Sequence, residues 1–188
     1  MTRTDLLNHL ATKYGLKTYL EIGTQDKAQN FNHIVCPQKL CVDPDQKADA
    51  DCIMTSDKFF ELYEGGDKWD LIFIDGLHHA DQVEKDLINA QKVLSSKGYI
   101  ILHDTNPQYE QHTIVPRQTP RGHWHGDVYR LAARLQNKVT IDIDCGCTVC
   151  TIHTTVSDVQ VDWKYFDKNR KELLNLIEWQ DFIKLYEP

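Results

Sequence analysis

The sequence predicts an α/β fold in which a mostly parallel sheet is covered by helices on both faces. Two apolar runs, 70–75 and 99–104, flank an amphipathic segment at 80–94, which gives the order strand, helix, strand. A helical crossover makes the two strands parallel, and strands that are apolar on both sides are buried between helical layers. Both runs end in an acid, so we expect these acids to meet at one edge of the sheet.

The other segments supply the remaining elements in order. Amphipathic spacing predicts helices at 4–14, 55–63, 126–135 and from 163 onward, with a short one at 28–35. Apolar or alternating runs predict strands at 17–23, 39–43, 51–54, 139–144 and 148–152. The last two are close enough to form an antiparallel hairpin at the sheet edge. The long polar segment 105–123 is expected to be a functional loop, such as a lid or a substrate wall.

Length and composition point to one folded unit. A chain of 188 residues suits a single α/β domain, 1–188, and 41% hydrophobic with 26% charged residues is typical of a globular protein. The opening residues lack the apolar core of a signal peptide, and no apolar run is long enough to cross a bilayer. We therefore expect a cytoplasmic protein that does not bind membranes.

Charge and cysteine content narrow the partners. A net charge of −7 without any run of Lys or Arg disfavours nucleic acid, so a small molecule or a glycan is the expected partner. The six cysteines are predicted to be free thiols. A zinc site of Cys145, Cys147 and Cys150 is disfavoured, because strand alternation turns Cys150 away from the other two. Assembly as a homo-oligomer is left open.

Polar residues at the strand ends predict a cofactor site. Asp43 follows Gly23 by 20 positions, an arrangement in which an acid binds ribose hydroxyls. The glycine-rich G-x-G-x-x-G pattern is absent after Gly23, which argues against close approach of a pyrophosphate. A nucleoside cofactor without phosphates fits these residues better than a dinucleotide does.

Several motifs carry a more specific resemblance. In order and spacing, the chain is similar to a class I S-adenosylmethionine (SAM)-dependent methyltransferase of the methyltransferase family 24 group in the motifs YLEIGTQDKAQNF, CVDPD, MTSDKFF, DLIFIDGLHH, GYIILHDTNP and WHGDVYR. These span residues 19–130. The resemblance implies a single Rossmann-like domain with a seven-stranded, mostly parallel sheet whose last strand is antiparallel.

The resemblance also implies which residues hold SAM. Glu21, Gly23 and Thr24 would lie along the methionine moiety, Asp43 would hold the ribose, and Ser56 and Asp57 would face the adenine. Asp75 counts among the cofactor contacts as well. One position departs from the pattern, because relatives usually carry glycine where this chain has Lys27. A long cationic side chain there would either crowd the cofactor or neutralise its carboxylate.

Metal-dependent O-methyltransferases of similar layout hold a divalent ion between acids at two strand ends. The matching residues are Asp75 and Asp104, with Thr105 or Asn106 as a third oxygen donor and Mg2+ as the ion. Such an ion lowers the pKa of a bound hydroxyl and orients it toward the sulfonium methyl group. His78, His79 and His103 are candidate bases, of which His78 and His103 match the family pattern. The predicted catalytic set is His78, His103 and Asp104.

Structural roles compete with these assignments. Asp43 and Asp75 could cap the segments that follow them, and one acid of the metal pair could contact only the cofactor's amino group. His103 could orient Asp104 rather than catalyse. The sequence His123-Trp-His125 could stack on an acceptor ring or anchor the long loop.

Taken together, the residues and the resemblance predict a SAM-dependent methyltransferase acting on an oxygen of a sugar or another small hydroxylated acceptor. Two alternatives remain. A nicotinamide or nucleotide-sugar oxidoreductase would use a similar sheet, although the glycine fingerprint is missing. A non-catalytic scaffold that retains the fold is kept open by Lys27.

Overall fold

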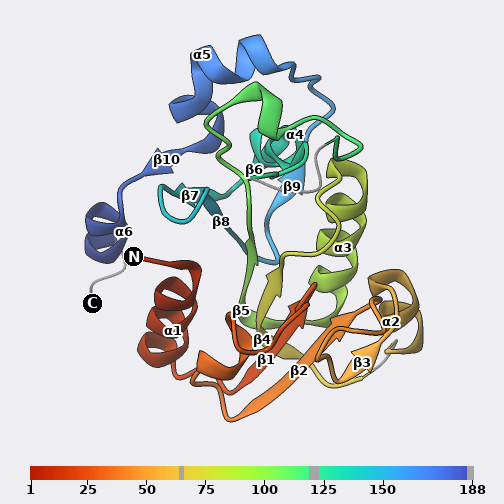
Figure 1. Ribbon diagram of the computed structural model, residues 1–188. Helices are drawn as coiled ribbons and strands as arrows, with labels where there is room; N and C mark the ends of the chain where they lie inside the picture. The colour runs from red at the N-terminus through yellow and green to blue at the C-terminus, as the bar shows by residue number, and fades with distance from the viewer. Residues whose placement is uncertain (64–65, 119–122, 186–188) are drawn as a thin grey trace.

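The computed structural model describes residues 1–63, 66–118 and 123–185. Within these ranges an eight-stranded sheet has the order β10-β7-β8-β5-β4-β1-β2-β3, and β6 pairs separately with β9 (Figure 1). The strands of the large sheet are β1 (Thr18–Ile22), β2 (Gln38–Asp43), β3 (Cys52–Ile53), β4 (Trp69–Ile74), β5 (Leu94–Leu102), β7 (Val139–Ile141), β8 (Cys147–Cys150) and β10 (Leu176–Ile177). The small pair is β6 (Leu135–Gln136) and β9 (Thr155–Val156).

The helices are α1 (Arg3–Tyr14), α2 (Ser56–Leu62), α3 (Ala80–Val93), α4 (Val128–Arg134), α5 (Trp163–Leu174) and α6 (Trp179–Leu185). Two short 3-10 helices, Phe31–His33 and Glu110–His112, lie in loops. The segment predicted as a helix at 28–35 therefore has only one 3-10 turn. The described part of the chain contains no helix with the length and apolarity that a bilayer crossing needs.

Strand alternation divides the core between the two faces of the sheet. The side chains of Leu20, Ile72 and Ile100 join one apolar cluster, to which α2, α3 and α4 contribute. Those of Tyr19, Leu71 and Ile101 join the other, which includes the buried residues of α1 and Phe182 of α6. The three layers of helix, sheet and helix are visible in Figure 1 and confirm the predicted fold class.

Strand direction at the carboxyl side of the sheet follows the predicted hairpin. Strand β8 pairs antiparallel with both β5 and β7, so β7 runs in the same direction as β5. The eighth strand was not predicted: β10 pairs in parallel with β7 and interrupts the helix expected from Trp163 onward. Helix α5 ends because Asn175 adopts a left-handed conformation with φ of 47°. The predicted count of seven strands is therefore one too low for the large sheet.

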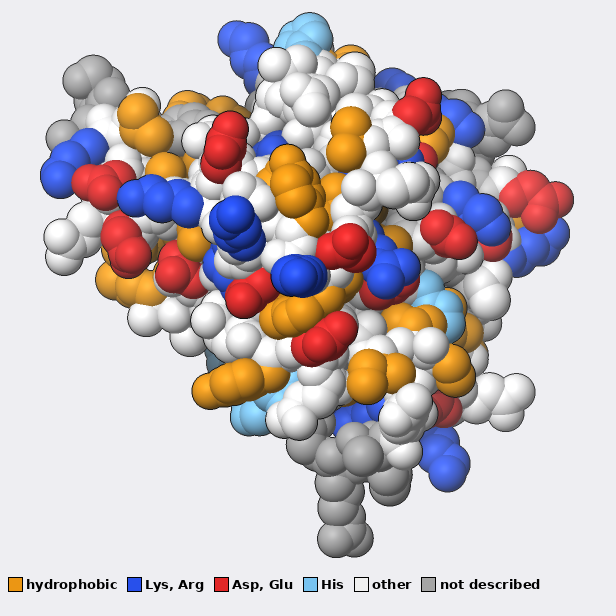
Figure 2. Space-filling model, turned by 90° about the horizontal axis from the view of Figure 1, so that it is seen from above, with side chains coloured by type: hydrophobic (Ala, Val, Ile, Leu, Met, Phe, Trp, Pro, Cys, Tyr) orange, Lys and Arg blue, Asp and Glu red, His pale blue; other side chains and the backbone are white. Residues whose placement is uncertain are grey.

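All six cysteines are free, as predicted. Cys147 and Cys150 are buried on opposite faces of the sheet, in agreement with the predicted alternation along β8. On the face shown in Figure 2, the described Lys and Arg side chains are interspersed with Asp and Glu, so basic side chains form no separate patch there.

Candidate active site

A cavity of about 590 Å3 opens at the carboxyl ends of β1, β2, β4 and β5. Parallel strands end at the same edge of a sheet, so polar residues after each strand meet there. The structure brings every predicted cofactor, catalytic and metal residue to the lining of this one cavity: Glu21, Gly23, Thr24, Asp43, Ser56, Asp57, Asp75, His78, His103 and Asp104.

The end of β1 places a buried carboxylate at the cavity. The Tyr19 hydroxyl donates to Glu21 Oε2, and the Asn30 amide donates to the same oxygen at 2.7 Å. Burial raises the pKa of Glu21 above its ordinary value, although both hydrogen bonds favour the charged form. This carboxylate is therefore held in a fixed position.

Gly23 is required by close packing as well as by backbone conformation. Its φ is +89°, and a Cβ atom at this position would lie 2.2 Å from the carbonyl oxygen of Asp75. The turn after β1 thus packs directly on the end of β4. This contact brings the Glu21 and Asp75 segments together at the cavity.

Asp43 is held by backbone amides. The amide of Gln25 donates to Asp43 Oδ2 at 2.9 Å, and the amide of Asp45 donates to Oδ1 at 2.8 Å. Each carboxylate oxygen has a second lone pair, so Asp43 keeps the capacity to accept two further hydrogen bonds, as ribose hydroxyls would require.

Lys27 lies outside the cavity. Its ammonium group pairs with Asp51 at 2.5 Å and lies 5.4 Å from the centroid of the Phe31 ring. Lys27 is not among the residues that line the cavity. The crowding or charge neutralisation considered from the sequence therefore does not occur in this conformation.

The cavity wall formed by α2 and α3 carries an acid that the sequence analysis missed. Gln82 Nε2 donates to Asp57 Oδ1 at 3.0 Å and to Asp86 Oδ1 at 3.1 Å, and it lies 3.4 Å from Ser56 Oγ. Asp86 is buried, and burial raises its pKa to about 6. The available signal was the position of Asp86 on the apolar face of α3, three residues after Val83.

Acids and imidazoles alternate at the ends of β4 and β5. Asp75 Oδ1 lies 3.2 Å from His103 Nδ1 and 3.3 Å from His78 Nε2. Asp104 Oδ2 lies 3.2 Å from His78 Nδ1. Burial alone would raise the pKa of Asp75, but the charge of His103 and the hydrogen bonds from both imidazoles lower it below its ordinary value.

Both imidazoles favour the protonated state. Burial opposes the charge on His78, but the hydrogen bond to Asp75 and the charges of Asp104 and Asp75 raise its pKa. Burial also opposes the charge on His103, but the negative charge of Asp75 and hydrogen bonds to nearby carboxylates raise its pKa well above its ordinary value. The two carboxylates are thus compensated by two imidazolium groups.

Arg3 and Trp124 line the cavity and Asp144 lies behind His103, and none of the three was predicted as a site residue. Asp144 Oδ2 lies 3.8 Å from His103 Nε2 and pairs with Arg3 at 3.2 Å, while the Trp124 ring stacks on His78 with centroids 5.1 Å apart. Asp144 could have been found, because it ends the strand predicted at 139–144, and β7 runs parallel to β5. Trp124 was noted for stacking only on an acceptor or as a loop anchor, and Arg3 carries no signal in the sequence.

The long loop partly forms the cavity wall. Arg117 of the 105–123 loop and Trp124, which directly follows it, line the cavity. Residues 119–122 of this loop lie outside the described ranges.

The expectation that Thr105 or Asn106 donates a third metal ligand is not met. The Asn106 amide group donates to Asp142 at 2.9 Å, and its oxygen accepts from Arg170 at 2.6 Å. Thr105 is fully buried, and neither residue lines the cavity. The hydrogen bond from Arg170 of α5 holds the Asn106 side chain away from the cavity, and no local pattern in the sequence indicates this contact.

The donor atoms nevertheless suit a divalent ion. One ligand atom from each of Asp75, His78 and Asp104 can be chosen so that all three lie within 4.8 Å of one another. Two carboxylates and an imidazole are ligands for divalent first-row metals and, through their oxygens, for Mg2+. The site therefore fits such an ion when the imidazole protons have been released.

Known proteins share this fold. The chain matches the O-methyltransferase from Bacillus cereus in complex with S-adenosylhomocysteine (SAH), with a TM-score of 0.54 and 15% identity over 82% of this chain and 80% of the other. It also matches the O-methyltransferase TomG from Streptomyces achromogenes, involved in tomaymycin synthesis, in complex with SAM, with a TM-score of 0.50 and 14% identity over 82% and 79%. A search of curated proteins finds no match.

A family comparison covers the first five strands of the large sheet. Residues 20–105 match the sequence model of a methyltransferase domain, methyltransferase family 24. This range contains the strand-end residues from Glu21 to Asp104, and the fold agrees with that of the two O-methyltransferases. Residues 20–105 of the chain thus match methyltransferase family 24 on a class I methyltransferase fold, and the predicted resemblance is confirmed.

Proposed function

We propose that the chain, taken as one domain over 1–188, is a SAM-dependent O-methyltransferase acting on a sugar or another small hydroxylated molecule. The observation that carries the proposal is that one cavity is lined by all seven predicted cofactor residues and by the His78–Asp75–Asp104 cluster. Six of the cofactor residues lie at the ends of β1 and β2 and at the start of α2, and Asp75 follows β4. The acid and histidine cluster lies at the ends of β4 and β5, where an acceptor would face the methyl group.

The protein's part in such a reaction is alignment and proton removal. The methyl group of SAM is activated by the sulfonium, so transfer needs the acceptor oxygen in line behind the carbon. The oxygen forms a bond to the methyl carbon while the carbon–sulfur bond breaks and SAH leaves as a neutral thioether. The proton of the hydroxyl passes to a base.

We assign the base to His78 rather than to His103. The side chain of His78 is 21% exposed and lines the cavity beside Trp124, whereas that of His103 is 7% exposed and is enclosed by Asp75 and Asp144. His103 then holds Asp75 in place. Because the pKa of His78 is raised, its neutral form, which accepts the proton, becomes abundant only above the ordinary imidazole range.

A divalent ion would be held by oxygens of Asp75 and Asp104. When bound, it would supply Lewis-acid chemistry that lowers the pKa of the acceptor hydroxyl. Its binding would displace the protons now shared between these carboxylates and the imidazoles, so metal affinity would rise with pH.

Calorimetric titration of the full chain with SAM, SAH and NAD tests the cofactor. Binding of SAM and SAH without NAD supports the proposal. Binding of NAD alone favours an oxidoreductase, and binding of none favours a scaffold.

Transfer of a labelled methyl group to a panel of sugars and other hydroxylated small molecules tests the acceptor. A matched panel of amines and thiols is the control for oxygen specificity. Parallel reactions with Mg2+ and with EDTA test the ion, since activity that EDTA leaves unchanged would remove the metal role of Asp75 and Asp104.

A further inference from the structure

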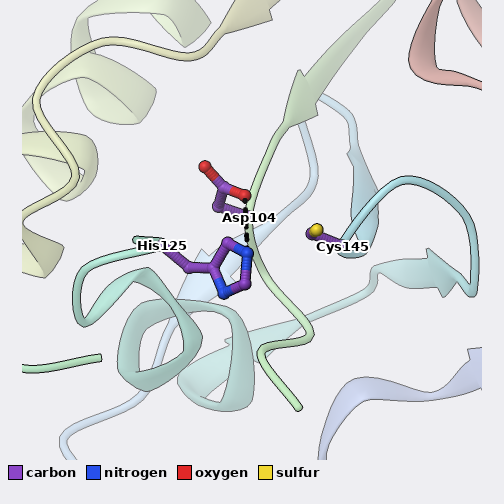
Figure 3. A group of neighbouring side chains, drawn as sticks. All are labelled: Asp104, His125 and Cys145. Carbon is purple, nitrogen blue, oxygen red and sulfur yellow. Dashed lines mark ion pairs between the residues drawn. The ribbon is translucent and has the colours of Figure 1, made fainter. Parts of the chain in front are cut away.

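A second group of metal-ligating side chains shares Asp104 with the cavity lining. One ligand atom from each of Asp104, His125 and Cys145 lies within 4.8 Å of the other two (Figure 3). They come from three separate segments: the end of β5, the residues before α4, and the connection from β7 to β8. Of the cysteines considered for zinc from the sequence, only Cys145 is in this group.

The spacing of these atoms suits an ion between them. His125 Nε2 lies 3.8 Å from Asp104 Oδ1, which is too far for a hydrogen bond. Nitrogen and oxygen ligands at about 2.1 Å from a tetrahedral ion lie about 3.4 Å apart, and a sulfur at about 2.3 Å lies slightly farther. A small adjustment of the side chains would therefore complete the coordination.

One ring nitrogen of His125 lacks a hydrogen-bond partner among the described residues. Its side chain is 7% exposed, and its Nδ1 has no hydrogen-bond partner among the described residues. Nε2 lies beyond hydrogen-bond distance of Asp104. An ion bound at Nε2 would replace the water that this nitrogen loses on burial, while Nδ1 would stay without a partner among the described residues.

The two oxygens of Asp104 face different groups. Oδ2 is the oxygen near His78 and His103, whereas Oδ1 is the oxygen near His125. His125 and Cys145 do not line the cofactor cavity. An ion on the Oδ1 side would therefore be separate from one held by Asp75 and Asp104 Oδ2.

Both ligand-bearing loops are fixed by adjacent glycines. A Cβ atom on Gly126 would lie 1.7 Å from the carbonyl oxygen of His78, and one on Gly146 would lie 2.5 Å from the backbone nitrogen of Asn106. The amide of Asn106 also donates to the Cys145 carbonyl at 2.8 Å. The backbone at His125 and Cys145 is thus held by close packing, as a preorganised site requires.

We propose that Asp104, His125 and Cys145 bind a transition-metal ion of the zinc class. Nitrogen, oxygen and sulfur donors select Zn2+ over Mg2+, and three protein ligands leave a fourth position for water. On binding, the Cys145 thiol loses its proton to solvent and coordinates as the thiolate. The ion joins three distant segments and fixes the carboxylate that faces His78, so that Asp104 becomes a positioning residue.

The test begins with metal content and cobalt spectroscopy of the full chain. Protein that has been stripped with a chelator and reloaded with Zn2+ should retain stoichiometric zinc after gel filtration. With Co2+ it should show the near-ultraviolet thiolate-to-cobalt absorption. Loss of all metal on gel filtration, or bound Co2+ without that absorption, overturns the proposal.

Variants assign the ligands. Cys145→Ser should abolish the thiolate absorption, and Cys145→Ser and His125→Gln should each weaken Zn2+ binding more than about 100-fold, since loss of a second-shell partner alone costs 10–100-fold. Cys52→Ser and His153→Gln are matched controls outside the group and should leave both readouts unchanged. Unchanged Zn2+ affinity in both ligand variants, with far-UV circular dichroism like that of the parent, contradicts the proposal.

The result is independent of the proposed function. Calorimetry with SAM reports on the cavity, and the thiolate absorption reports on Cys145, which lies outside the cavity lining. SAM binding without the absorption refutes the metal site alone. The absorption without SAM binding refutes the methyltransferase alone.

Discussion

The two halves of the cavity hold their carboxylates by different means. At the ends of β1 and β2, Glu21 and Asp43 are fixed by neutral donors: a hydroxyl, a side-chain amide and two backbone amides. At the ends of β4 and β5, Asp75 and Asp104 face imidazoles whose protonation is favoured. We call these the cofactor half and the acceptor half.

The difference indicates that the two halves have different roles in the reaction. Carboxylates held by neutral donors keep lone pairs for further hydrogen bonds, which suits the binding of a neutral ribose. Carboxylates paired with imidazoles lie beside groups that can take up and release a proton, which suits acid–base chemistry and ion binding. Variants in one half should therefore change cofactor affinity, and variants in the other should change turnover.

The largest effect is expected in the acceptor half. His78→Gln keeps a polar side chain but removes the base, so kcat should fall about 10²–10⁴-fold. The dissociation constant of SAM should stay within a factor of about three, because only the acceptor half is changed. Wild-type kcat/KM should rise with pH through the raised pKa of His78, and the variant should lose this limb.

Rates over a pH series, with calorimetry at each pH, provide the measurement. His79→Gln changes the neighbouring histidine outside the cavity lining and serves as the control. A kcat of His78→Gln equal to that of the wild type would remove His78 from catalysis.

A smaller effect is expected in the cofactor half. Asp43→Asn keeps an oxygen acceptor but loses the charge that strengthens hydrogen bonds to the ribose. SAM should bind about 10–100-fold more weakly, which corresponds to hydrogen bonds to charged groups at about 1.5–3 kcal/mol. Once SAM is saturating, kcat should be nearly unchanged.

Asp45→Asn is the control for Asp43→Asn, because Asp45 lies beside Asp43 at the cavity. A fall in kcat under saturating SAM would show that the two halves do not act separately.

Asp86 differs from the other acids of the cofactor half because its pKa is raised to about 6. It is buried, and its hydrogen bonds include no cationic partner. Its folded-state pKa is raised from 3.8 to about 6, so the folded protein binds this proton more tightly than the unfolded chain does. The stability that this contributes is present below the unfolded pKa and is lost as pH rises through about 6.

Asp86→Asn should therefore raise the free energy of unfolding by roughly 1–3 kcal/mol at pH 8 and much less at pH 4. Urea unfolding at both pH values provides the measurement. Asp81→Asn, on the exposed face of the same helix, should show no such pH-dependent gain. Equal changes at pH 4 and pH 8 would contradict the assignment.

The smallest effect is expected at Lys27. Lys27→Gly restores the residue that relatives usually carry, but the side chain already points to Asp51 and away from the cavity. SAM affinity should change by less than about threefold, since exposed ion pairs contribute little. Calorimetric titration of Lys27→Gly with SAM provides the measurement. A large gain in SAM affinity would mean that Lys27 obstructs the cofactor in solution.

The sequence predicted the acids at the strand ends more completely than it predicted the residues that surround them. Acids at the ends of parallel strands must share an edge, so Asp43, Asp75 and Asp104 could be placed together from local patterns alone. Asp144 was missed because its strand was predicted only as half of a hairpin. Since β8 is antiparallel to both β5 and β7, β7 is parallel to β5, and the end of its strand lies at the same edge as Asp104. Asp86 was missed because helical periodicity was used to select apolar residues alone.

Other features depend on tertiary contacts that leave no local pattern. Arg3 reaches the site because α1 packs beside the sheet, and its partner Asp144 is 141 residues away in the chain. Asn106 is turned away by Arg170 of α5. The extra strand β10 consists of two residues, too few for a periodic signal.

The stacking of Trp124 on His78 gives the protein a built-in optical reporter. An indole whose neighbour is an imidazolium emits weakly, because the cation quenches its excited state. A ligand that enters the cavity and changes the charge or position of His78 should change the emission of Trp124. Because the chain has three other tryptophans, the Trp124 signal would be taken as the difference from the emission of a Trp124→Phe variant.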